Sequence, residues 1–216
     1  MEKTLKKLLK SFNKRSKSDA IININNINRT KMAKILGELK FKTGAEVGVA
    51  QGNHARILCE NIPDLKLYCI DVWEKYPGYH QYKNRISRYY QIAKKQLSPY
   101  DCQFIKKFSM DATDDFEDES LDFVYIDSAH DFKSVANDIF EWTKKVSTGG
   151  IVFGHDYVNS IEGKSKYPID VKSVIQAYAH SHGIKPLLIL ENDLFDKNFH
   201  PESPGWLFVK QKNDRL

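Results

Sequence analysis

From residue 28 onward, short apolar runs alternate with amphipathic stretches in which apolar residues recur every three or four positions. The apolar runs predict β-strands and the amphipathic stretches predict helices. The predicted strands cover 45–49, 65–71, 102–107, 121–127, 150–155, 186–191 and 206–210. The predicted helices cover 30–39, 54–61, 83–97, 133–145 and 171–182. This alternation is typical of a parallel sheet covered by helices on both faces.

The connection between the last two predicted strands differs from the earlier ones. Residues 192–204 contain turn formers and are too few to hold a crossover helix. Parallel neighbours in a sheet need such a crossover, whereas antiparallel neighbours can be joined by a short loop. We therefore expect seven strands, of which the last runs antiparallel to the others.

The first eighteen residues have a different pattern. One apolar stripe would run between lysines if they formed a helix, and its members are Leu5, Leu8, Leu9 and Phe12. Three interpretations stay open: a helix packed on its own domain or on the partner subunit of a homodimer, a helix that contacts an anionic membrane surface, and a frayed tail. The Asn/Ile-rich segment 21–30 predicts a linker or a solitary edge strand. We expect residues 1–30 to form this basic helix and linker, and residues 31–216 to form one α/β domain.

Charge changes the picture of possible partners. The formal net charge is +5, but residues 1–18 hold seven Lys/Arg against one Glu, a balance of +6, which leaves the remaining chain at −1. A nearly neutral body lacks the broad basic surface that binds a phosphate backbone, so nucleic acid is not the expected partner. No apolar run approaches the roughly 20 residues that cross a bilayer, so we expect a cytoplasmic protein. The three cysteines, Cys59, Cys69 and Cys102, lack metal-type spacing and are expected to be reduced.

The first predicted strand runs into a glycine turn with the sequence EVGVAQG. Gly48 and Gly52 would let the backbone approach a ligand closely. Their spacing is not the GxGxxG of pyrophosphate sites, and Glu46 would repel a phosphate, so the turn suits a ligand with a cationic end. A plain strand-to-helix turn is the alternative.

Carboxylates follow the next two strands. Asp71 ends the second strand about 20 residues after the glycine turn, where a carboxylate can accept both ribose hydroxyls of an adenosine. Asp111 follows the third strand and could accept a hydrogen bond from an adenine amino group. A capping role for Asp71, and a solvated acidic loop around Asp111, are the alternatives.

Four further polar residues lie at the carboxyl ends of the fourth and fifth strands: Asp127, His130, His155 and Asp156. Open α/β sheets bind their ligands at this edge. Two carboxylates suit Mg²⁺, and an added imidazole shifts the preference toward Mn²⁺, Fe²⁺ or Zn²⁺. Loop hydrogen bonds are the alternative role for the two histidines.

The order of these motifs resembles the class I S-adenosylmethionine-dependent methyltransferases. More narrowly, it is similar to the small-molecule branch with metal-assisted sugar O-methyltransferases of macrolide tailoring, and more distantly to catechol-type enzymes. The segments that carry the resemblance are EVGVAQG, IDVWE, SMDAT, LDFVYIDSAHDFKSVANDI and GGIVFGHDY, within residues 43–206. The resemblance implies a Rossmann-like three-layer α/β sandwich with strand order 3-2-1-4-5-7-6 and an antiparallel strand 7.

It also implies S-adenosylmethionine as cofactor, with the glycine turn under the methionine, Asp71 on the ribose and Trp73 beside the adenine. The cofactor-binding residues that it implies are Glu46, Gly48, Gly52, Asp71, Trp73, Asp111, Ala112 and Asp127. In metal-dependent relatives the corresponding positions hold a divalent cation, Mg, Mn or Fe, and here they are Asp127, His155 and Asp156. His155 stands where an oxygen ligand is usual.

These observations lead to one leading hypothesis, the methylation of a hydroxyl on a small metabolite or sugar. A neutral hydroxyl is a poor nucleophile, so a cation or a base must help it lose its proton. His130 is the first choice as base and His155 the substitute, with Asp127 as a third catalytic residue. The alternatives are an N-methyltransferase, a metal-assisted hydroxylase-like relative, a nucleotide-dependent dehydrogenase, and a nucleotide-binding module anchored by its basic helix.

Overall fold

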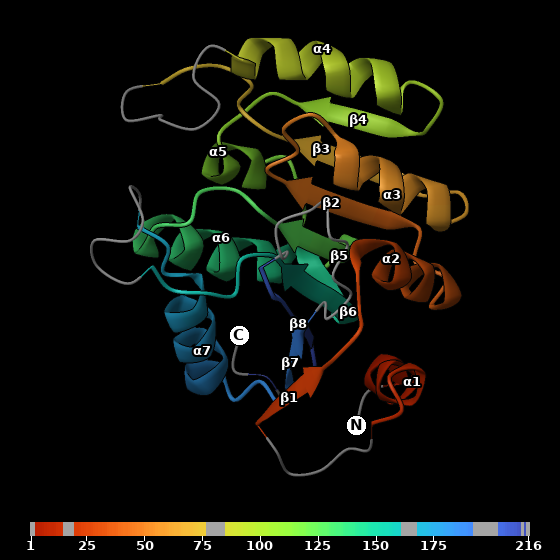
Figure 1. Cartoon of the computed structure of the whole chain (residues 1–216), viewed down its shortest axis with the longest axis vertical. Helices are drawn as coiled ribbons and strands as arrows, with labels where there is room; N and C mark the ends of the chain where they lie inside the picture. The colour runs from red at the N-terminus through yellow and green to blue at the C-terminus, as the bar shows by residue number, and fades with distance from the viewer. Residues whose placement is uncertain are drawn as a thin grey trace.

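The alternating pattern forms a single eight-stranded sheet in the computed structural model, which describes residues 3–14, 20–76, 85–160, 168–191, 203–212 and 214 (Figure 1). The strands are β1 (Ile21–Ile24), β2 (Thr43–Val47), β3 (Lys66–Ile70), β4 (Cys102–Ile105), β5 (Leu121–Ile126), β6 (Val146–Gly154), β7 (Leu187–Leu190) and β8 (Gly205–Val209). Their order across the sheet is β1-β7-β8-β6-β5-β2-β3-β4. β8 runs antiparallel to both of its neighbours, and every other pair is parallel.

The strand order confirms the Rossmann-like prediction, because β2 to β8 lie in the order 3-2-1-4-5-7-6 with the last strand antiparallel. The predicted count of seven strands was one too low. β1 adds an eighth strand at the edge, where Ile22 lies opposite Leu188 of β7. Only Ile24 of this strand is buried, so its period-2 pattern was too weak to separate a paired edge strand from a linker.

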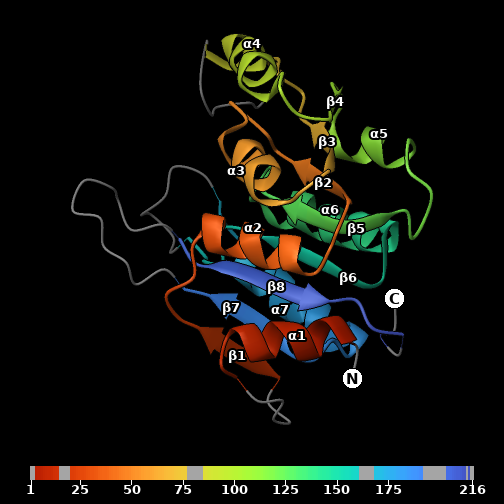
Figure 2. The same ribbon diagram turned by 90° about the vertical axis from the view of Figure 1, so that its right-hand side faces the viewer.

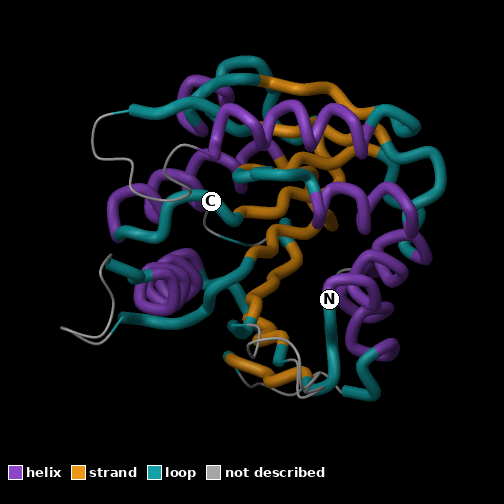
Figure 3. Tube along the Cα trace, turned by 45° about the horizontal axis from the view of Figure 1, so that its top comes forward, coloured by secondary structure: helices purple, strands orange, loops and turns teal. Residues whose placement is uncertain are grey.

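Helices cover both faces of the sheet (Figures 1 and 2). They are α1 (Lys3–Ser11), α2 (Arg29–Glu38), α3 (Asn53–Asn61), α4 (Ile86–Leu97), α5 (Ser109–Thr113), α6 (Phe132–Lys145) and α7 (Val171–His182). Side chains of α1 to α4 share one apolar core with one face of the sheet, and side chains of α5 to α7 share a second core with the other face. The strands therefore form the middle of three layers, as Figure 3 shows. Residues 83–84, where the predicted helix 83–97 begins, lie outside the described residues.

The amphipathic stripe near the N-terminus is buried. Leu5, Leu8 and Leu9 of α1 belong to the same core as α2 to α4, and Phe12 packs against it. The lysines of the described part of this segment are exposed. The boundary at residue 30, the membrane contact and the homodimer stay predictions, but α1 and β1 share their core and sheet with the rest of the chain. None of the described helices combines the length and apolar character that a membrane span requires.

Candidate functional site

The glycine turn after β2 lies directly against the end of β5. Gly48 has φ +94°, and a Cβ at this position would lie 2.1 Å from the carbonyl oxygen of Asp127. Any larger residue would therefore push the turn away from β5, besides adopting a backbone conformation that L-residues avoid. Gly52, with φ +82°, ends the turn and precedes α3. The two glycines thus bring the start of α3 and the end of β5 to one place.

Asp71 fixes the other side of this turn. Its carboxylate accepts hydrogen bonds from the backbone N–H of Ala50 at 2.8 Å and of Trp73 at 2.9 Å. Burial raises the pKa of Asp71, and the backbone N–H groups partly oppose that shift. The turn after β2 and the end of β3 are therefore joined through backbone donors. The role of Asp71 at a ribose stays a prediction.

Trp73 is buried beside the glycine turn, and its predicted place beside an adenine stays a prediction. Its side chain is 1 % exposed, and its ring packs against Tyr90 and Phe104, with centroids 5.0 and 5.8 Å away. Its Nε1–H donates to the carbonyl oxygen of Ala50 at 2.8 Å. The buried indole therefore supports the turn through this hydrogen bond.

Glu46 is also buried, and its carboxylate faces a histidine that the sequence did not single out. It is 2 % exposed, and its Oε2 lies 3.3 Å from Nδ1 of His54. Burial raises the pKa of Glu46, and His54 partly offsets this effect. The His54 ring packs on Tyr125 of β5, with centroids 3.9 Å apart. The only sequence signal for His54 is its position at the start of the helix that follows the glycine turn.

At the end of β4, Asp111 is exposed in the first turn of α5, and Ala112 is fully buried. Asp111 is thus accessible at the edge where an adenine contact was predicted.

Asp138 links this edge to the loop after β5. This buried carboxylate accepts hydrogen bonds from the hydroxyl groups of Ser109, at 2.5 Å, and Ser128. Burial raises the pKa of Asp138 to about 6, against the lowering effect of the two hydroxyls. Asp138 could have been found from the sequence as an acidic residue on the apolar face of α6, beside Val135 and Trp142.

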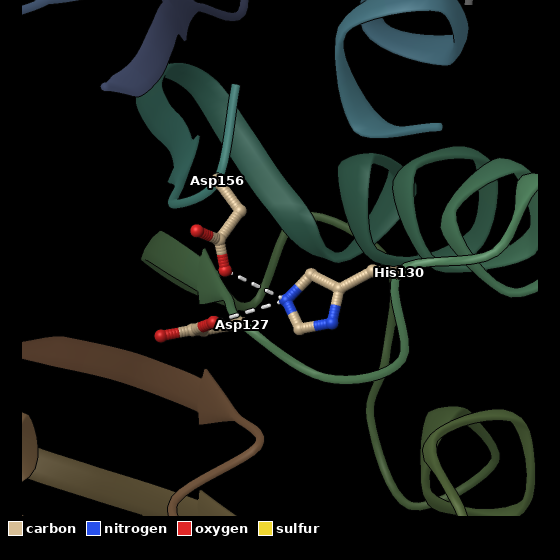
Figure 4. A group of neighbouring side chains, drawn as sticks. All are labelled: Asp127, His130 and Asp156. Atoms are coloured by element: carbon tan, nitrogen blue, oxygen red, sulfur yellow. Dashed lines mark ion pairs between the residues drawn. The ribbon is translucent and has the colours of Figure 1, made fainter. Parts of the chain in front are cut away.

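Three predicted residues converge where β5 and β6 end (Figure 4). His130 lies in the loop between β5 and α6, and its Nε2 is 2.9 Å from Oδ2 of Asp156 and 3.6 Å from Oδ1 of Asp127. Asp127 directly follows β5, and Asp156 follows β6 with φ +52°. We refer to these three residues as the Asp–His–Asp cluster.

The carboxylates of this cluster favour a protonated imidazole. Burial by itself lowers the pKa of His130, but hydrogen bonds and charge interactions with Asp127 and Asp156 outweigh it and raise the pKa to about 9. Burial would raise the pKa of Asp156, but His130 and His155 hold it well below its usual range. At neutral pH, with no ligand bound, an imidazolium therefore lies between the two carboxylates.

One ligand atom from each residue of the cluster lies within 4.8 Å of the others, so their oxygen and nitrogen donors fit a divalent cation. The predicted metal set was Asp127, His155 and Asp156, and the structure brings His130 into this group instead. His155 contacts the cluster from outside, with Nδ1 3.3 Å from Oδ1 of Asp156. Its Nε2 is buried without a hydrogen-bond partner among the described residues.

A pocket that is partly open to solvent lies beside the cluster. It lies on the α2 side of β5 and β6, and its wall includes Met32, Phe153, Leu190, Arg29, His54 and His155. Arg29 and His155 also contact the cluster, because Nη2 of Arg29 lies 3.7 Å from Oδ2 of Asp127. A small molecule in this pocket would therefore lie next to the carboxylates.

Comparison with known proteins agrees with this arrangement. A methyltransferase domain family model matches residues 45–157, more than half of the chain. A search of curated proteins gives no match. The most similar solved structures include cofactor-bound Rv0187 from MTB, with a TM-score of 0.65, 13 % identity, and coverage of 98 % of this chain and 92 % of that one. An O-methyltransferase from Bacillus cereus in complex with SAH gives a TM-score of 0.62 at 14 % identity, and the alignment covers 96 % of this chain and 90 % of that one.

An rRNA methylase from Streptococcus thermophilus gives a TM-score of 0.58 at 10 % identity, and the alignment covers 86 % of this chain and 98 % of that one. At these identities the solved structures establish the fold, and the family model carries the assignment. The chain therefore belongs to the methyltransferase domain family, among the class I S-adenosylmethionine-dependent methyltransferases.

Proposed function

We propose that this methyltransferase transfers the methyl group of S-adenosylmethionine to a hydroxyl of a small acceptor, with the Asp–His–Asp cluster at the centre of the reaction. One observation carries the proposal. Two carboxylates and an imidazole meet beside the glycine turn, and Arg29 and His155, which contact them, line a pocket. Hydroxyl methylation needs a cofactor seat, an acceptor pocket and a group that helps remove the hydroxyl proton.

The backbone around the turn supports a defined direction for the cofactor. The adenosine would lie along the ends of β3 and β4, between Asp71 and the exposed Asp111 at the start of α5. The methionine would then lie over Gly48, which touches the end of β5 at Asp127. This direction brings the positively charged sulfonium toward the carboxylates of the cluster, which attract it.

His130 supports the acid–base step. A neutral imidazole at this position could take a hydroxyl proton, and Asp127 and Asp156 would stabilise the imidazolium that forms. With a pKa of about 9, His130 is a stronger base than an ordinary histidine but is mostly protonated at pH 7. Turnover that uses this base should therefore rise with pH up to about 9.

The cluster could also hold a divalent cation, with Asp127, His130 and Asp156 as ligands. When bound, such an ion would lower the pKa of an acceptor hydroxyl. The mixed oxygen and nitrogen donors favour Mn²⁺ or Fe²⁺ over Mg²⁺. Nε2 of His130 cannot bind an ion and accept a proton at once, so the base would then be His155, whose imidazole contacts Asp156.

The pocket supports a small hydroxylated acceptor, a sugar among the candidates. Apolar side chains, including Met32, Phe153 and Leu190, make up much of its wall, and a few polar groups face it, as in sites for small metabolites. The chain beyond residue 18 has a formal charge of −1, which does not favour a nucleic-acid acceptor.

Binding calorimetry with S-adenosylhomocysteine, the demethylated cofactor, tests the first part of the proposal. We expect saturable binding that is retained in His130→Ala, because this imidazole serves the transfer and not the cofactor seat. A wild-type protein that binds neither S-adenosylmethionine nor its product would contradict the proposed function.

Titration with Mn²⁺ in the presence of S-adenosylhomocysteine tests the cation. We expect one site in the wild type, and at least about tenfold weaker binding in Asp127→Asn and in Asp156→Asn. His180→Ala, which removes an exposed imidazole on α7, is the matched control and should bind like the wild type. Equal Mn²⁺ affinity in all four proteins would exclude the cluster as the metal site.

A further inference from the structure

The three cysteines of the chain gather at one place in the fold, although 43 residues separate the first from the last. Cys59 lies on α3, Cys69 on β3 and Cys102 at the start of β4. All three are free thiols, and Sγ of Cys59 lies 3.6 Å from Sγ of Cys102. Cys59 lies in the last turn of α3 and Cys102 begins β4, so this pair lies toward the sheet edge opposite the Asp–His–Asp cluster.

Burial distinguishes the members of the group. Cys69 is fully buried, whereas Cys59 and Cys102 are both partly exposed. A small oxidant can therefore reach the pair that is already in contact. A disulfide has an S–S distance of about 2.05 Å, so closing the 3.6 Å gap requires the two sulfurs to approach by about 1.5 Å.

We propose that Cys59 and Cys102 form an oxidisable dithiol that closes to an intramolecular disulfide between α3 and β4 when the protein meets a low-molecular-weight disulfide such as oxidised glutathione. Cys102 attacks the glutathione disulfide, which forms a mixed disulfide and releases one glutathione thiolate. Cys59 then attacks the Cys102 sulfur, loses its proton and releases the second glutathione. Two protein thiols and one oxidised glutathione thus become one protein disulfide and two reduced glutathiones.

The surroundings of Cys102 suit it to the first attack. Hydrogen bonds from the thiols of Cys59 and Cys69 lower the pKa of Cys102 to about 4, which favours the nucleophilic thiolate. The contact with Cys102 raises the pKa of Cys59, so Cys59 stays protonated in the reduced protein. Once Cys102 carries glutathione its negative charge is gone, and Cys59 can ionise more easily. The order of attack therefore follows from the arrangement of the group.

The disulfide would constrain residues 59–102, which include β3 and α4. A link of this kind removes conformational freedom from the unfolded chain and so raises the melting temperature. For a loop of this length in a chain of this size, we expect a rise of roughly 5 °C or more. The inference does not depend on the proposed methyl-acceptor chemistry.

The test uses the full chain, reduced and then equilibrated under native conditions with oxidised glutathione. After alkylation of the remaining thiols, peptide mass spectrometry should show a linked Cys59–Cys102 pair in at least about tenfold excess over any other pairing. Cys69→Ser is the matched control and should form the same link with the same rise in melting temperature. Cys59→Ser and Cys102→Ser should form no intramolecular disulfide and show no rise.

A second sample, oxidised in denaturant, shows what pairing the unfolded chain gives. The proposal is overturned if the native and unfolded proteins give the same distribution of pairs, or if the main native product is intermolecular or contains Cys69. A native protein that stops at mixed disulfides with glutathione, or keeps three free thiols, also overturns it.

Discussion

Asp71 and Asp156 both follow strands at the same edge of the sheet, but the structure holds their carboxylates in different ways. Asp71 accepts hydrogen bonds from backbone N–H groups, which are present whatever the neighbouring side chains are. Asp156 is held by the imidazoles of His130 and His155. The first arrangement is set by chain geometry before a ligand binds. The second depends on protonation, so it should respond to pH and to bound charges.

The largest effect should come from Gly48→Ala, which disturbs the turn whose backbone holds Asp71. The added Cβ would meet the Asp127 carbonyl oxygen, so we expect a loss of more than about 3 kcal/mol in the free energy of unfolding. Gly183→Ala is the matched control: Gly183 also has a positive φ, of +72°, but a Cβ there has nothing within 4 Å, so about 1 kcal/mol is expected. Urea denaturation measures both. Equal losses would show that the contact with β5 does not matter.

Asp71→Ala should weaken S-adenosylhomocysteine binding by about tenfold or more, because it removes the acceptor of two backbone donors at the predicted ribose position. Asp122 also accepts two backbone hydrogen bonds, from Lys42 and Thr43, but at the start of β5. Asp122→Ala should therefore lose a similar amount of stability, about 1 to 3 kcal/mol, and keep cofactor affinity. Calorimetry and denaturation of both variants separate the two effects. Similar cofactor affinities would contradict the role of Asp71.

The stability that comes from the contacts of His130 with Asp127 and Asp156 should respond to pH. The pKa of His130 is about 9 in the folded protein, above the ordinary value of about 6.5, so its contribution to stability is fully present below pH 6.5 and is lost as pH rises through 9. The expected loss is about 3 kcal/mol.

Asp156→Asn should lower the pKa of His130 by about one unit or more and reduce this loss. An NMR titration of the imidazole, with denaturation at pH 6 and pH 9.5, measures both. An unchanged titration in the variant would mean that Asp156 does not hold the proton.

The smallest effect should come from Trp73→Phe, which removes the hydrogen bond to Ala50 but keeps an aromatic ring in the core. We expect a loss of about 1 kcal/mol in stability and a two- to threefold weaker affinity for S-adenosylhomocysteine. Trp206→Phe is the matched control, because Nε1 of Trp206 has no hydrogen-bond partner among the described residues. If both variants bind the cofactor equally well, Trp73 does not brace the turn.

Most of the sheet could be predicted because its strands are long apolar runs between clear turns. Parallel strands buried on both faces give that signal strongly, and the short connection before β8 indicated its direction. β1 could not be predicted with the same certainty, since its polar Asn23 and its single buried residue, Ile24, resemble a linker. Its place in the sheet is determined by pairing with the edge of β7, a strand far along the chain that the local sequence around β1 gives no sign of.

The site was predictable as a set of positions but not as a set of side-chain directions. Strand ends located Asp127 and Asp156 at one edge, because parallel strands end together there. The choice between His130 and His155 depends on how each loop turns after its strand. Asp156 adopts a left-handed backbone conformation at φ +52°, and this turn takes its carboxylate to His130 while His155 borders the pocket.

Burial also gives two predicted residues surroundings that residue type alone does not indicate. Trp73 was expected beside an adenine because aromatic rings often stack on bases; it is buried in the core, and its contact with an adenine stays a prediction. Glu46 was expected near a cationic ligand; its carboxylate faces His54, and the ligand contact stays a prediction. Such outcomes depend on packing between distant segments, which no local pattern records.

The pairing of β1 with β7 has a consequence for how the protein is made. Ile21 lies opposite Leu187, so a strand that leaves the ribosome early has a partner 166 residues later in the chain. At roughly 5 to 20 residues per second, β1 waits about ten to thirty seconds before that partner has been synthesised. Contacts across such a long separation also form late in folding, because closing a large loop is slow. The edge of the sheet is therefore completed only after the central strands have had time to assemble.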